Sequence, residues 1–501
     1  GGAWLESREL LLIGGQAKTA DLSRGFVRQI GHQEIDGVGL AKPVAKCAVQ
    51  LQAPIPKQEF IDLVNAGSSD RPGPVFIELC LDTQGAPPLL SENAVTQKIE
   101  NVLAAANDVE QVVQKLHASQ RPVLLIGGGV SRKTAQSIQQ SMSDSGIPVM
   151  TTWNGADRID ASHPQYLGRP NTWGQRAANL LMAQADVIVA VGTRLGMQQT
   201  GFNWQEFGRN AFIVQVDIDK SELEKGHPKV DLPICGDADS FLEDLLPKIH
   251  GQWDEWVTYA HDVQEALPLN DPENETGAGF VSPYDFYADL SELATQNDVI
   301  IPCSSGGANS VSMQVIKQKF GQVIITDKGL ASMGYGLGGA IGAAMAHPGR
   351  RTFLIEGDGG FAQNLQELAT VAVNRLPIKI FIFANNGYGS IRMTQKNYFG
   401  GAYLGCDTET GLGFPDWHLL FESFGIPATT VDANWASDSN VIATLESAEP
   451  HGYIIPIDPL QTYWPKIMSR IVEGGGMESN PLHMMSPDLP PNTFTKVTKY
   501  L

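Results

Sequence analysis

From Thr352 to Met393 the chain reads TFLIEGDGGFAQNLQELATVAVNRLPIKIFIFANNGYGSIRM, and this stretch decides the fold class. Residues 352–355 and 378–383 are short β-branched and aromatic runs, which is typical of buried parallel strands. Between them, residues 363–373 carry apolar residues at helical spacing, and Pro377 closes the connection. The stretch therefore predicts a βαβ unit, the building block of an α/β fold with a parallel sheet.

Polar residues follow both predicted strands at the point where each strand ends. Asp358 stands between Gly357 and Gly359, and Asn386 comes directly after the second strand. Open α/β sheets bind their ligands at this carboxyl edge. Carboxylate and amide oxygens suit a hard cation such as Mg²⁺, and the N–H groups of Gly359 and Gly360 can face an anion. We expect a metal ion carrying a diphosphate here; the alternative is that these residues only make turns.

The composition excludes several classes of protein. The chain has 501 residues, of which 42% are hydrophobic and 18% charged, as in a soluble globular protein, and no apolar run has the length of a membrane span. The net charge of −20, without a basic stripe, argues against nucleic acid or anionic membrane as a partner. Five scattered cysteines without CxxC spacing predict a reducing cytoplasm and no disulfide frame or zinc knuckle.

Three blocks of alternating strand and helix patterns divide the chain. Residues 1–90 include ELLLIGGQ and PGPVFIELCLD, residues 105–250 include RPVLLIGGGV and ADVIVAVGTRL, and residues 280–460 contain the stretch quoted above. A long polar helix is predicted from about Asn93 to Gln114, before the second block. Residues 461–501 are predicted to be an extended tail over a surface rather than a helix. We therefore expect an α/β protein with three doubly wound parallel-sheet domains.

Two glycine patterns imitate nucleotide-binding motifs. GYGLGG at residues 334–339 matches GxGxxG, but the strand VIITD ends several residues earlier, whereas a dinucleotide fingerprint follows its strand directly. The small residues that continue from it favour close helix packing instead. GGGVSRKT at residues 127–134 lacks the P-loop glycine before Lys133. Among ten dispersed histidines, His32 lies in a glycine-flanked loop and is a candidate to line a site, although an ordinary surface histidine is the alternative.

The GDG and NN strings carry a resemblance to a known family. Gly357-Asp358-Gly359 followed by Asn385-Asn386 resembles the thiamine diphosphate motif. KGLASMGYGLGGAIGAAMA resembles the segment that precedes this motif in acetolactate synthase, and the likeness covers nearly all of the chain. GTRLGMQQTGFNWQEF, EGDGGFAQNLQELAT, GYGSIRMTQKNYFGG and PLHMMSP are similar to strings of an acetolactate-synthase-like branch in branched-chain deoxysugar biosynthesis, of the yersiniose type.

The resemblance implies how the cofactor and its Mg²⁺ would be held. The metal takes the side chains of Asp358 and Asn386 and the backbone carbonyl of Tyr388. Met333 corresponds to the bulky apolar residue that bends the cofactor and brings its aminopyrimidine nitrogen near the reactive carbon; core packing is the alternative. The diphosphate lies against the turn SSGGAN, residues 304–309, and the glycines around Asp358. The expected cofactor-binding residues are Ser305, Gly306, Gly307, Met333, Gly357, Asp358, Gly359, Gly360, Asn386, Tyr388, Gly389 and Ser390.

The second block resembles the FAD-binding domain of acetolactate synthases. Arg194 in VGTRL corresponds to an arginine that contacts the flavin cofactor, and GRPNTWG at residues 168–174 corresponds to a segment beneath the flavin. The family's string of acids and arginines after Arg194 is replaced by LGMQQTG, and related decarboxylases keep this fold with the site empty. The residues expected to contact FAD are Gly127, Gly128, Asn171, Thr172, Gly192, Arg194, Asp217, Ile218, Asp237 and Ala238.

One part of the family pattern is missing. The family uses a glutamate of the first domain to hydrogen-bond N1′ of the aminopyrimidine, and that residue precedes the string that resembles ESRELLLIGGQ. This chain starts almost at that string, so we expect that an N-terminal segment of the first domain is absent from the sequence. Neither Glu6 nor Glu34 matches the activating glutamate by position.

The family likeness implies a carboligase that decarboxylates pyruvate or a similar 2-oxo acid and transfers the acyl carbanion to a carbonyl acceptor. The residues expected around the reaction are Met333, His32, Gln33 and Gln395, with His32 and Gln33 approaching from a neighbouring subunit of a homodimer or homotetramer. The small Gly389 and Ser390 leave room for a bulky acceptor, and Gln395 can hydrogen-bond its hydroxyls, which favours a nucleotide-linked 4-keto-deoxysugar. Helix packing explains the small residues equally well.

Other functions stay open. The enzymatic alternatives are acetolactate synthase itself and a simple 2-oxo acid decarboxylase. An alternative of another class is a catalytically silent homologue that serves as a binding or regulatory subunit, which the missing glutamate would favour.

Overall fold

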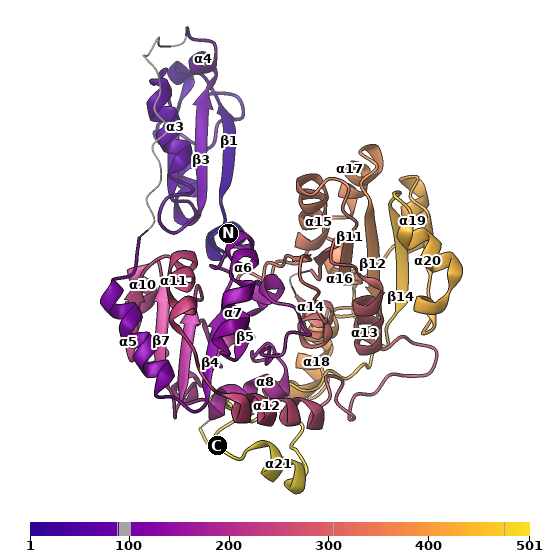
Figure 1. The fold of residues 1–501 in the computed structure, drawn as a ribbon. Helices are drawn as coiled ribbons and strands as arrows, with labels where there is room; N and C mark the ends of the chain where they lie inside the picture. Colours follow the sequence, from indigo (N-terminus) through magenta and orange to yellow (C-terminus); the bar gives the residue numbers. More distant parts are fainter. Residues whose placement is uncertain (88, 90–101, 304, 475) are drawn as a thin grey trace. The chain divides into compact units, whose positions relative to one another are not determined.

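A computed structural model describes residues 1–87, 89, 102–303, 305–474 and 476–501. The chain divides into two units (Figure 1): an N-terminal unit of Gly1–Val102 with Gly329–Ala331, and a larger unit of Leu103–Lys328 with Ser332–Leu501. Among the residues so described, none of the helices combines the length and the apolar character that a membrane crossing requires.

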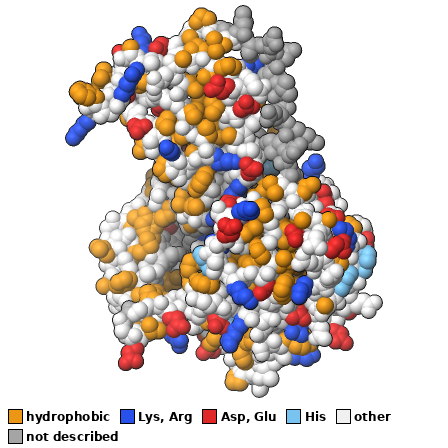
Figure 2. Space-filling model, turned by 90° about the vertical axis from the view of Figure 1, so that its left-hand side faces the viewer, with side chains coloured by type: hydrophobic (Ala, Val, Ile, Leu, Met, Phe, Trp, Pro, Cys, Tyr) orange, Lys and Arg blue, Asp and Glu red, His pale blue; other side chains and the backbone are white. Residues whose placement is uncertain are grey.

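The N-terminal unit is built on a three-stranded parallel sheet in the order β1-β3-β2. Ile77 of the central strand is paired with Ile13 on one side and Val49 on the other. The edge strand β1 carries four apolar residues in a row, Leu10–Ile13, each at least 42% exposed, and Figure 2 shows apolar side chains on the surface of this unit. The elements are α1 (Gly2–Leu5), β1 (Leu10–Gln16), α2 (Gly37–Ala41), β2 (Cys47–Leu51), α3 (Lys57–Asn65), β3 (Pro74–Cys80) and α4 (Leu81–Gln84).

The first sheet of the larger unit has five parallel strands in the order β5-β4-β6-β7-β8. Every residue of β4 and β6 is buried, because helices cover both faces of the sheet. Its strands are β4 (Pro122–Ile126), β5 (Val149–Thr151), β6 (Val187–Val191), β7 (Phe212–Asp217) and β8 (Leu232–Cys235). Its helices are α5 (Ala106–His117), α6 (Arg132–Ser137), α7 (Gln139–Ser145), α8 (Arg176–Gln184), α9 (Met197–Thr200), α10 (Lys220–Glu224), α11 (Ala238–Leu245) and α12 (Asp254–Ala266).

The second sheet of the larger unit has six parallel strands in the order β10-β9-β11-β12-β14-β13. The predicted βαβ unit is confirmed, because β11 pairs in parallel with β12 and Thr352 lies opposite Ile378. The strands are β9 (Val299–Ile301), β10 (Val323–Ile324), β11 (Thr352–Gly357), β12 (Ile378–Ala384), β13 (Ala428–Thr430) and β14 (His451–Pro456). The helices are α13 (Pro283–Leu293), α14 (Gly306–Val315), α15 (Tyr335–Ala346), α16 (Asp358–Phe361), α17 (Leu368–Val373), α18 (Gly389–Tyr398), α19 (Trp417–Ser423) and α20 (Ser439–Glu446).

Helices cover both faces of this second sheet. Phe286 of α13 and Val311 of α14 share a core with Phe353 of β11. On the opposite face, α17 and Leu337 of α15 pack against the strand side chains that point away from the first core. The sheet is therefore doubly wound, as the sequence predicts, and it presents its carboxyl edge for binding.

Two expectations about connecting segments need correction. The predicted helix from Asn93 falls partly on residues outside the described ones, and helix α5 begins only at Ala106. Residues 102–105 are not helical, and Ala104 packs closely against Gly236. In the tail, β15 (Ser469–Ile471) and β16 (Met477–Ser479) form a hairpin.

The tail also ends in a helix, which the prediction of an extended tail did not include. Helix α21 (Pro491–Val497) has proline at its first positions, where the missing N–H has no helical partner to lose. Val497 and Leu482 are buried in the core of the five-stranded sheet. The tail is thus a packed part of the larger unit.

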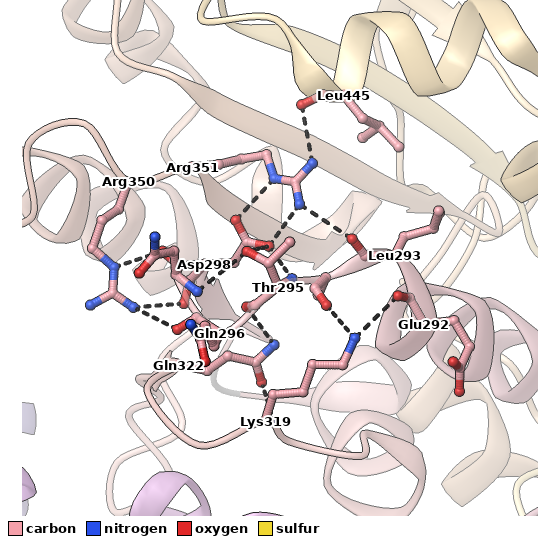
Figure 3. Close-up of polar contacts among 12 residues, drawn as sticks. Glu292, Leu293, Thr295, Gln296, Asp298, Lys319, Gln322, Arg350, Arg351 and Leu445 are labelled. Carbon is pink, nitrogen blue, oxygen red and sulfur yellow. Dashed lines mark hydrogen bonds and ion pairs between the residues drawn. The ribbon is translucent and has the colours of Figure 1, made fainter. Parts of the chain in front are cut away.

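The amino edge of the six-stranded sheet is held by charged groups (Figure 3). Asp298, directly before β9, accepts hydrogen bonds from Arg351, directly before β11, at 2.7 Å and 3.0 Å. Arg351 also donates to the carbonyl oxygens of Leu293 and Leu445, and the Thr295 N–H donates to Asp298 at 2.6 Å. This network joins two strands and two helices at the end of the sheet opposite the carboxyl edge.

A buried arginine joins the two sheet regions of the larger unit. Arg169, which is 1% exposed, follows the region of β5 and reaches the end of α14. Its guanidinium donates to the carbonyl oxygens of Met313 and Ile316 and to the side-chain oxygen of Gln318. Gln318 in turn donates to the carbonyl oxygen of Ile159 at 3.0 Å, so the contact is anchored from both sides.

Candidate active site

The best-placed site lies where the six-stranded sheet changes winding direction. Strands β9 and β11 are neighbours, yet α14, which follows β9, covers one face while α17, which follows β11, covers the other. A crevice at the carboxyl ends of two such strands is where doubly wound sheets bind ligands. The turn before α14 and the Gly357–Gly360 loop flank this point. Topology therefore brings together the two glycine segments that the sequence predicts to hold a diphosphate.

Asp358 is the buried acid of this edge. It is 1% exposed, and its two carboxylate oxygens accept the N–H groups of Gly359 at 2.7 Å and Asn385 at 3.0 Å. Burial raises the pKa of Asp358 to about 6, although the backbone N–H groups of residues 385–387 and Gly359 oppose this shift. Its hydrogen-bond partners within the described ranges are N–H groups, and a buried carboxylate with such partners is suited to bind a cation.

The other two predicted metal ligands follow on the neighbouring strand. Asn386 is exposed and has a left-handed backbone (φ +56°), a conformation that asparagine tolerates. The carbonyl oxygen of Tyr388 accepts the Arg392 N–H at 2.9 Å and keeps its second lone pair. Carboxylate, amide and carbonyl oxygens make up a donor set that fits Mg²⁺. The buried side-chain oxygen of Asn385, which has no partner among the described residues, adds a further polar group to this edge.

Met333 lies against the glycine loop. A Cβ atom on Gly359 would lie 3.6 Å from the terminal methyl of Met333 and only 2.3 Å from the ring of Tyr388. The side-chain amide of Gln363 contacts the Met333 sulfur at 3.6 Å. Met333 is half-buried rather than packed in the core, so part of the side chain faces outward beside the predicted metal site. Its predicted role toward the cofactor stays a prediction.

The turn before α14 is shaped for a close approach. Gly306 has φ +70°, and a Cβ atom there would lie 3.9 Å from the Ser390 hydroxyl, so the starts of α14 and α18 are adjacent. Asn309 holds the turn, because its amide donates to the carbonyl oxygens of Pro302 and Cys303. Ser304 of the predicted turn lies outside the described residues. Backbone N–H groups at the start of the ten-residue α14 suit a phosphate.

Two further residues of this edge escape sequence reasoning. Tyr463, from the tail, lies with its ring 2.7 Å from the position of a Cβ on Gly307, and burial together with the charge of Asp358 raises the pKa of Tyr463. Glu356 is 2% exposed, and burial raises the pKa of Glu356 to about 8. Its two carboxyl oxygens occupy the space that side chains on Gly336 and Gly360 would need. No local pattern announces Tyr463; Glu356 could have been noticed as a lone acid inside an apolar strand.

The residues predicted around the reacting groups are placed unequally. His32 and Gln33 are exposed in a loop of the N-terminal unit, whereas Gln395 lies on α18 of the larger unit. Both polar atoms of the Gln395 amide already bind the backbone N–H and carbonyl of Leu404, each at 3.1 Å. Gln395 therefore has a structural function in the loop after α18, and its predicted contact with acceptor hydroxyls stays a prediction.

Glu34 is occupied by its own loop. It is 7% exposed and accepts the N–H groups of Ile30, Gly31 and Ser23 at 2.8, 3.1 and 2.5 Å. These hydrogen bonds lower the pKa of Glu34 to about 2. An ionised carboxylate has no proton to donate to a heterocyclic nitrogen, and these N–H groups already occupy Glu34. That Glu34 is not the activating glutamate stays a prediction.

The predicted FAD residues gather at the carboxyl edge of the five-stranded sheet. Gly127, Gly192, Asp217 and Asp237 each follow or end one of its strands. Within the described residues the Arg194 guanidinium has no hydrogen-bond partner, so it could bind an anionic or flavin group. Gly127 and Gly192 pack closely, because a Cβ atom on Gly127 would lie 2.1 Å from the Gly192 carbonyl oxygen. Their predicted contact with FAD stays a prediction.

Other members of the predicted FAD set have structural partners. Asp237 caps α11 by accepting the Ser240 N–H at 2.8 Å. Asn171 and Thr172 are buried. The backbone N–H of Asn171 donates to the side-chain oxygen of Asn179, and the Asn179 amide donates to the Asn171 carbonyl oxygen. The Thr172 carbonyl oxygen accepts the Ile467 N–H of the tail. The side-chain oxygen of Asn171 accepts hydrogen bonds from the Thr172 hydroxyl at 3.2 Å and the Trp173 N–H at 3.3 Å. The predicted contacts of Asn171, Thr172 and Arg194 with FAD stay predictions.

Comparison with known proteins agrees with this geometry. Residues 109–245 match the family model described as the thiamine pyrophosphate enzyme central domain, and residues 305–455 match that of the C-terminal TPP binding domain. The chain is 30% identical over 476 residues to the acetolactate synthase isozyme 2 large subunit of Escherichia coli (strain K12), covering 94% of this chain and 83% of that protein. It is 29% identical over 479 residues to the probable acetolactate synthase large subunit of Methanocaldococcus jannaschii, covering 92% and 78%, respectively.

A third relative extends the same pattern. The acetolactate synthase large subunit of Lactococcus lactis is 29% identical over 446 residues, which are 86% of this chain and 74% of that protein. The matched C-terminal model spans the turn before α14, the Gly357–Gly360 loop and Asn386, so the similarity includes the edge described above.

Proposed function

The chain belongs to the acetolactate synthase large-subunit family of thiamine-pyrophosphate-dependent enzymes, and from this premise we propose that it decarboxylates a 2-oxo acid and transfers the acyl unit to a carbonyl acceptor. The observation that carries the proposal is the buried Asp358 at the point where the six-stranded sheet changes winding direction. Asp358, Asn386 and the Tyr388 carbonyl would hold Mg²⁺, and the start of α14 would hold the diphosphate. When bound, thiamine diphosphate supplies the nucleophilic carbon that such a reaction needs.

The residues around this edge would orient the bound group and limit water. Met333 presents an apolar side chain beside Gly359, where it would support the cofactor between its two ends. The ring of Tyr388 also lies against Gly359, and the ring of Tyr463 lies against Gly307. Excluding water protects a carbanion from protonation, which is what favours ligation over release of an aldehyde.

A binding measurement tests the first part of the proposal. Calorimetry should show that thiamine diphosphate binds only with Mg²⁺ present, because the metal links the diphosphate to Asp358. Labelled pyruvate should then give a ligated product. If the protein binds neither the cofactor nor pyruvate, the alternative of a silent binding subunit replaces the enzyme proposal; release of acetaldehyde as the main product would instead favour a simple decarboxylase.

Two acceptors are supported by different observations. The names of the relatives support a second 2-oxo acid, as in acetolactate synthase. The small Gly389 and exposed Ser390 at the start of α18 support a larger acceptor, and for it we propose a nucleotide-linked 4-keto-deoxysugar. Both acceptors offered together at saturation with labelled pyruvate separate the two proposals. Acetolactate as the dominant product would refute the sugar acceptor.

We further propose that FAD binds at the carboxyl edge of the five-stranded sheet through Arg194 and the Asp217–Ile218 turn. The support is the Arg194 guanidinium beside the end of β6, which has no hydrogen-bond partner in the part of the chain that the structure describes. Purified protein should show flavin absorbance or regain it on reconstitution, and Arg194→Ala should weaken FAD retention. A protein that takes up no FAD would contradict this proposal without affecting the one on thiamine diphosphate.

We also propose a homodimer or larger assembly. The support is the exposed apolar run Leu10–Ile13 on β1, since a strand with apolar residues on both faces needs a covering layer. A stable interface would bury more than about 1,000 Å². Sedimentation of the cofactor-saturated protein should therefore show at least a dimer, and Leu12→Asp should weaken it. A stable, active monomer would contradict the proposal.

A further inference from the structure

Lys466, in the tail, is a buried cation in unusual surroundings. The residue is 4% exposed, and its ammonium lies 4.5 Å from the ring centre of Trp464 and 5.2 Å from that of Trp173. Its nearest polar contact is the Met393 sulfur at 2.8 Å. Within the described residues no oxygen atom accepts a hydrogen bond from this ammonium. Two aromatic rings and a thioether attract this desolvated charge, but none of them supplies an anionic oxygen.

Another buried lysine shows what a structural lysine looks like in this chain. Lys379 on β12 is also buried, but its ammonium donates to the carbonyl oxygens of Thr444 at 2.7 Å and Glu449 at 2.6 Å and to the Ser447 hydroxyl. These oxygens replace the water that the ammonium loses on folding. Among the residues that the structure describes, Lys466 has no comparable set of oxygen partners. Burial lowers the pKa of Lys466 to about 8, so the group is still mainly charged at neutral pH.

A buried cation without an oxygen partner costs folding free energy that its aromatic and sulfur contacts do not fully offset. Leaving a cation without an oxygen partner destabilises a protein, and an apolar side chain of similar volume would fill the same space without this cost. Ionisable groups in surroundings of this kind cluster at functional sites, where a ligand can supply the missing partner. A cation with three donors and no acceptor is complemented by an anionic oxygen group.

The position of Lys466 connects it to the candidate active site. Met393 lies on α18, which begins at Gly389 directly after the Asn386–Tyr388 segment. Met393 is four residues into this helix, about 6 Å along its axis from Gly389. Trp173 comes from the region of the five-stranded sheet, so the ammonium lies where that region, α18 and the tail meet. Trp173, Met393 and Trp464 are all half-buried, so the residues that surround the ammonium are themselves partly exposed to solvent.

We propose that Lys466, framed by Trp173, Trp464 and Met393, binds an anionic oxygen group of a substrate that enters beside α18. The group is either the carboxylate of a 2-oxo acid or a phosphate of a nucleotide-linked acceptor, which share the same charge chemistry. This inference rests on the proposed function for the identity of the substrates. The anion site itself is defined by the four residues and is testable without turnover.

Calorimetry with two unreactive probes tests the site. The protein is first saturated with Mg²⁺ and thiamine diphosphate, so that pyrophosphate cannot report the cofactor site, and is then titrated with oxamate or with pyrophosphate. At least one probe should bind the wild-type protein, and Lys466→Met should weaken its affinity at least tenfold, while Lys466→Arg keeps it within a few-fold. Lys499→Met is the matched control, because Lys499 is an exposed tail lysine that also lies over tyrosine rings. It should leave the affinity unchanged.

A stability measurement separates binding from structure. In the absence of ligand, Lys466→Met should raise the denaturation midpoint, because it removes the unpartnered charge, whereas Lys379→Met should lower it. Oxamate dependence identifies the carboxylate as the source, and pyrophosphate dependence alone identifies the phosphate. The inference is overturned if neither probe binds, if Lys466→Met binds as tightly as the wild type, or if Lys466→Met unfolds or lowers the midpoint.

Failure of this inference is distinguishable from failure of the proposed function. Thiamine diphosphate affinity should be the same in the wild type and Lys466→Met, because Asp358 and the start of α14 are untouched. If the wild type binds no thiamine diphosphate, the proposed function fails, and the oxamate titrations still report on Lys466.

Discussion

Replacing Gly336 by alanine tests the close packing of α15 on β11 that supports the Met333 turn. A Cβ atom at this position would lie 2.0 Å from a Glu356 carboxyl oxygen and 3.0 Å from a methyl carbon of Leu354. Both neighbours are buried, so neither can move into solvent. Overpacking of this kind costs about 3 kcal/mol, while alanine in a helix interior gains about 1 kcal/mol over glycine. We therefore expect Gly336→Ala to destabilise the protein by about 2 kcal/mol.

A second glycine of the same helix provides the control. None of the described residues comes within 4 Å of a Cβ atom at Gly342, so Gly342→Ala should stabilise the protein by about 1 kcal/mol. Chemical denaturation of both variants measures the difference, and combining Gly336→Ala with Glu356→Ala should recover much of the loss because the clashing oxygen is gone. The shift of α15 should also weaken thiamine diphosphate binding through Met333. If both alanine variants are stabilised alike, the close contact between Gly336 and Glu356 is wrong.

Three further perturbations test separate parts of the structure. Asp358→Ala should reduce Mg²⁺-dependent thiamine diphosphate affinity at least 100-fold by calorimetry, whereas Asp416→Ala, which removes an exposed cap of α19, should not; equal affinities would refute the metal assignment. Burial and the Lys379 charge lower the pKa of His451 to about 4. The neutral imidazole therefore contributes to the free energy of unfolding above pH 6.5, and about 3 kcal/mol of this contribution is lost as the pH falls through 4. Denaturation at pH 7 and pH 4 should show a smaller acid loss in His451→Gln. Arg351→Met leaves the buried Asp298 without its cation and should cost about 3 kcal/mol, against less than about 1 kcal/mol for the exposed Arg375→Met; similar losses would contradict the network in Figure 3.

The sequence was sufficient for the parts of the fold that depend on local pattern. Strands β11 and β12 fall where the β-branched runs predict them, and their parallel pairing places Asp358 and Asn386 at one edge. This works because a strand buried on both faces tolerates few polar residues, so its ends are marked by the first acid or amide that follows. The GYGLGG pattern also behaves as predicted, since Gly336 serves helix packing.

The remainder depended on contacts between distant segments. Tyr463 and Lys466 reach α14 and α18 from the tail, and no periodicity within the tail indicates where it will pack. Gln395 looked available for a ligand because its partner, Leu404, belongs to an irregular loop. The start of α5 was misplaced because residues 102–105 are suitable for a helix, yet Ala104 packs against Gly236 instead. Tertiary contacts override local preference at all of these positions.

The buried Arg169 has a consequence for how this protein could be recombined with its relatives. Its guanidinium belongs to one sheet region, while its acceptors at Met313, Ile316 and Gln318 belong to the other. A chimera with a crossover between residues 174 and 306 would combine this arginine with a foreign α14, and a mismatch there would leave a buried charge without acceptors. A chimera with a relative should therefore take both sheet regions of the larger unit from the same parent protein.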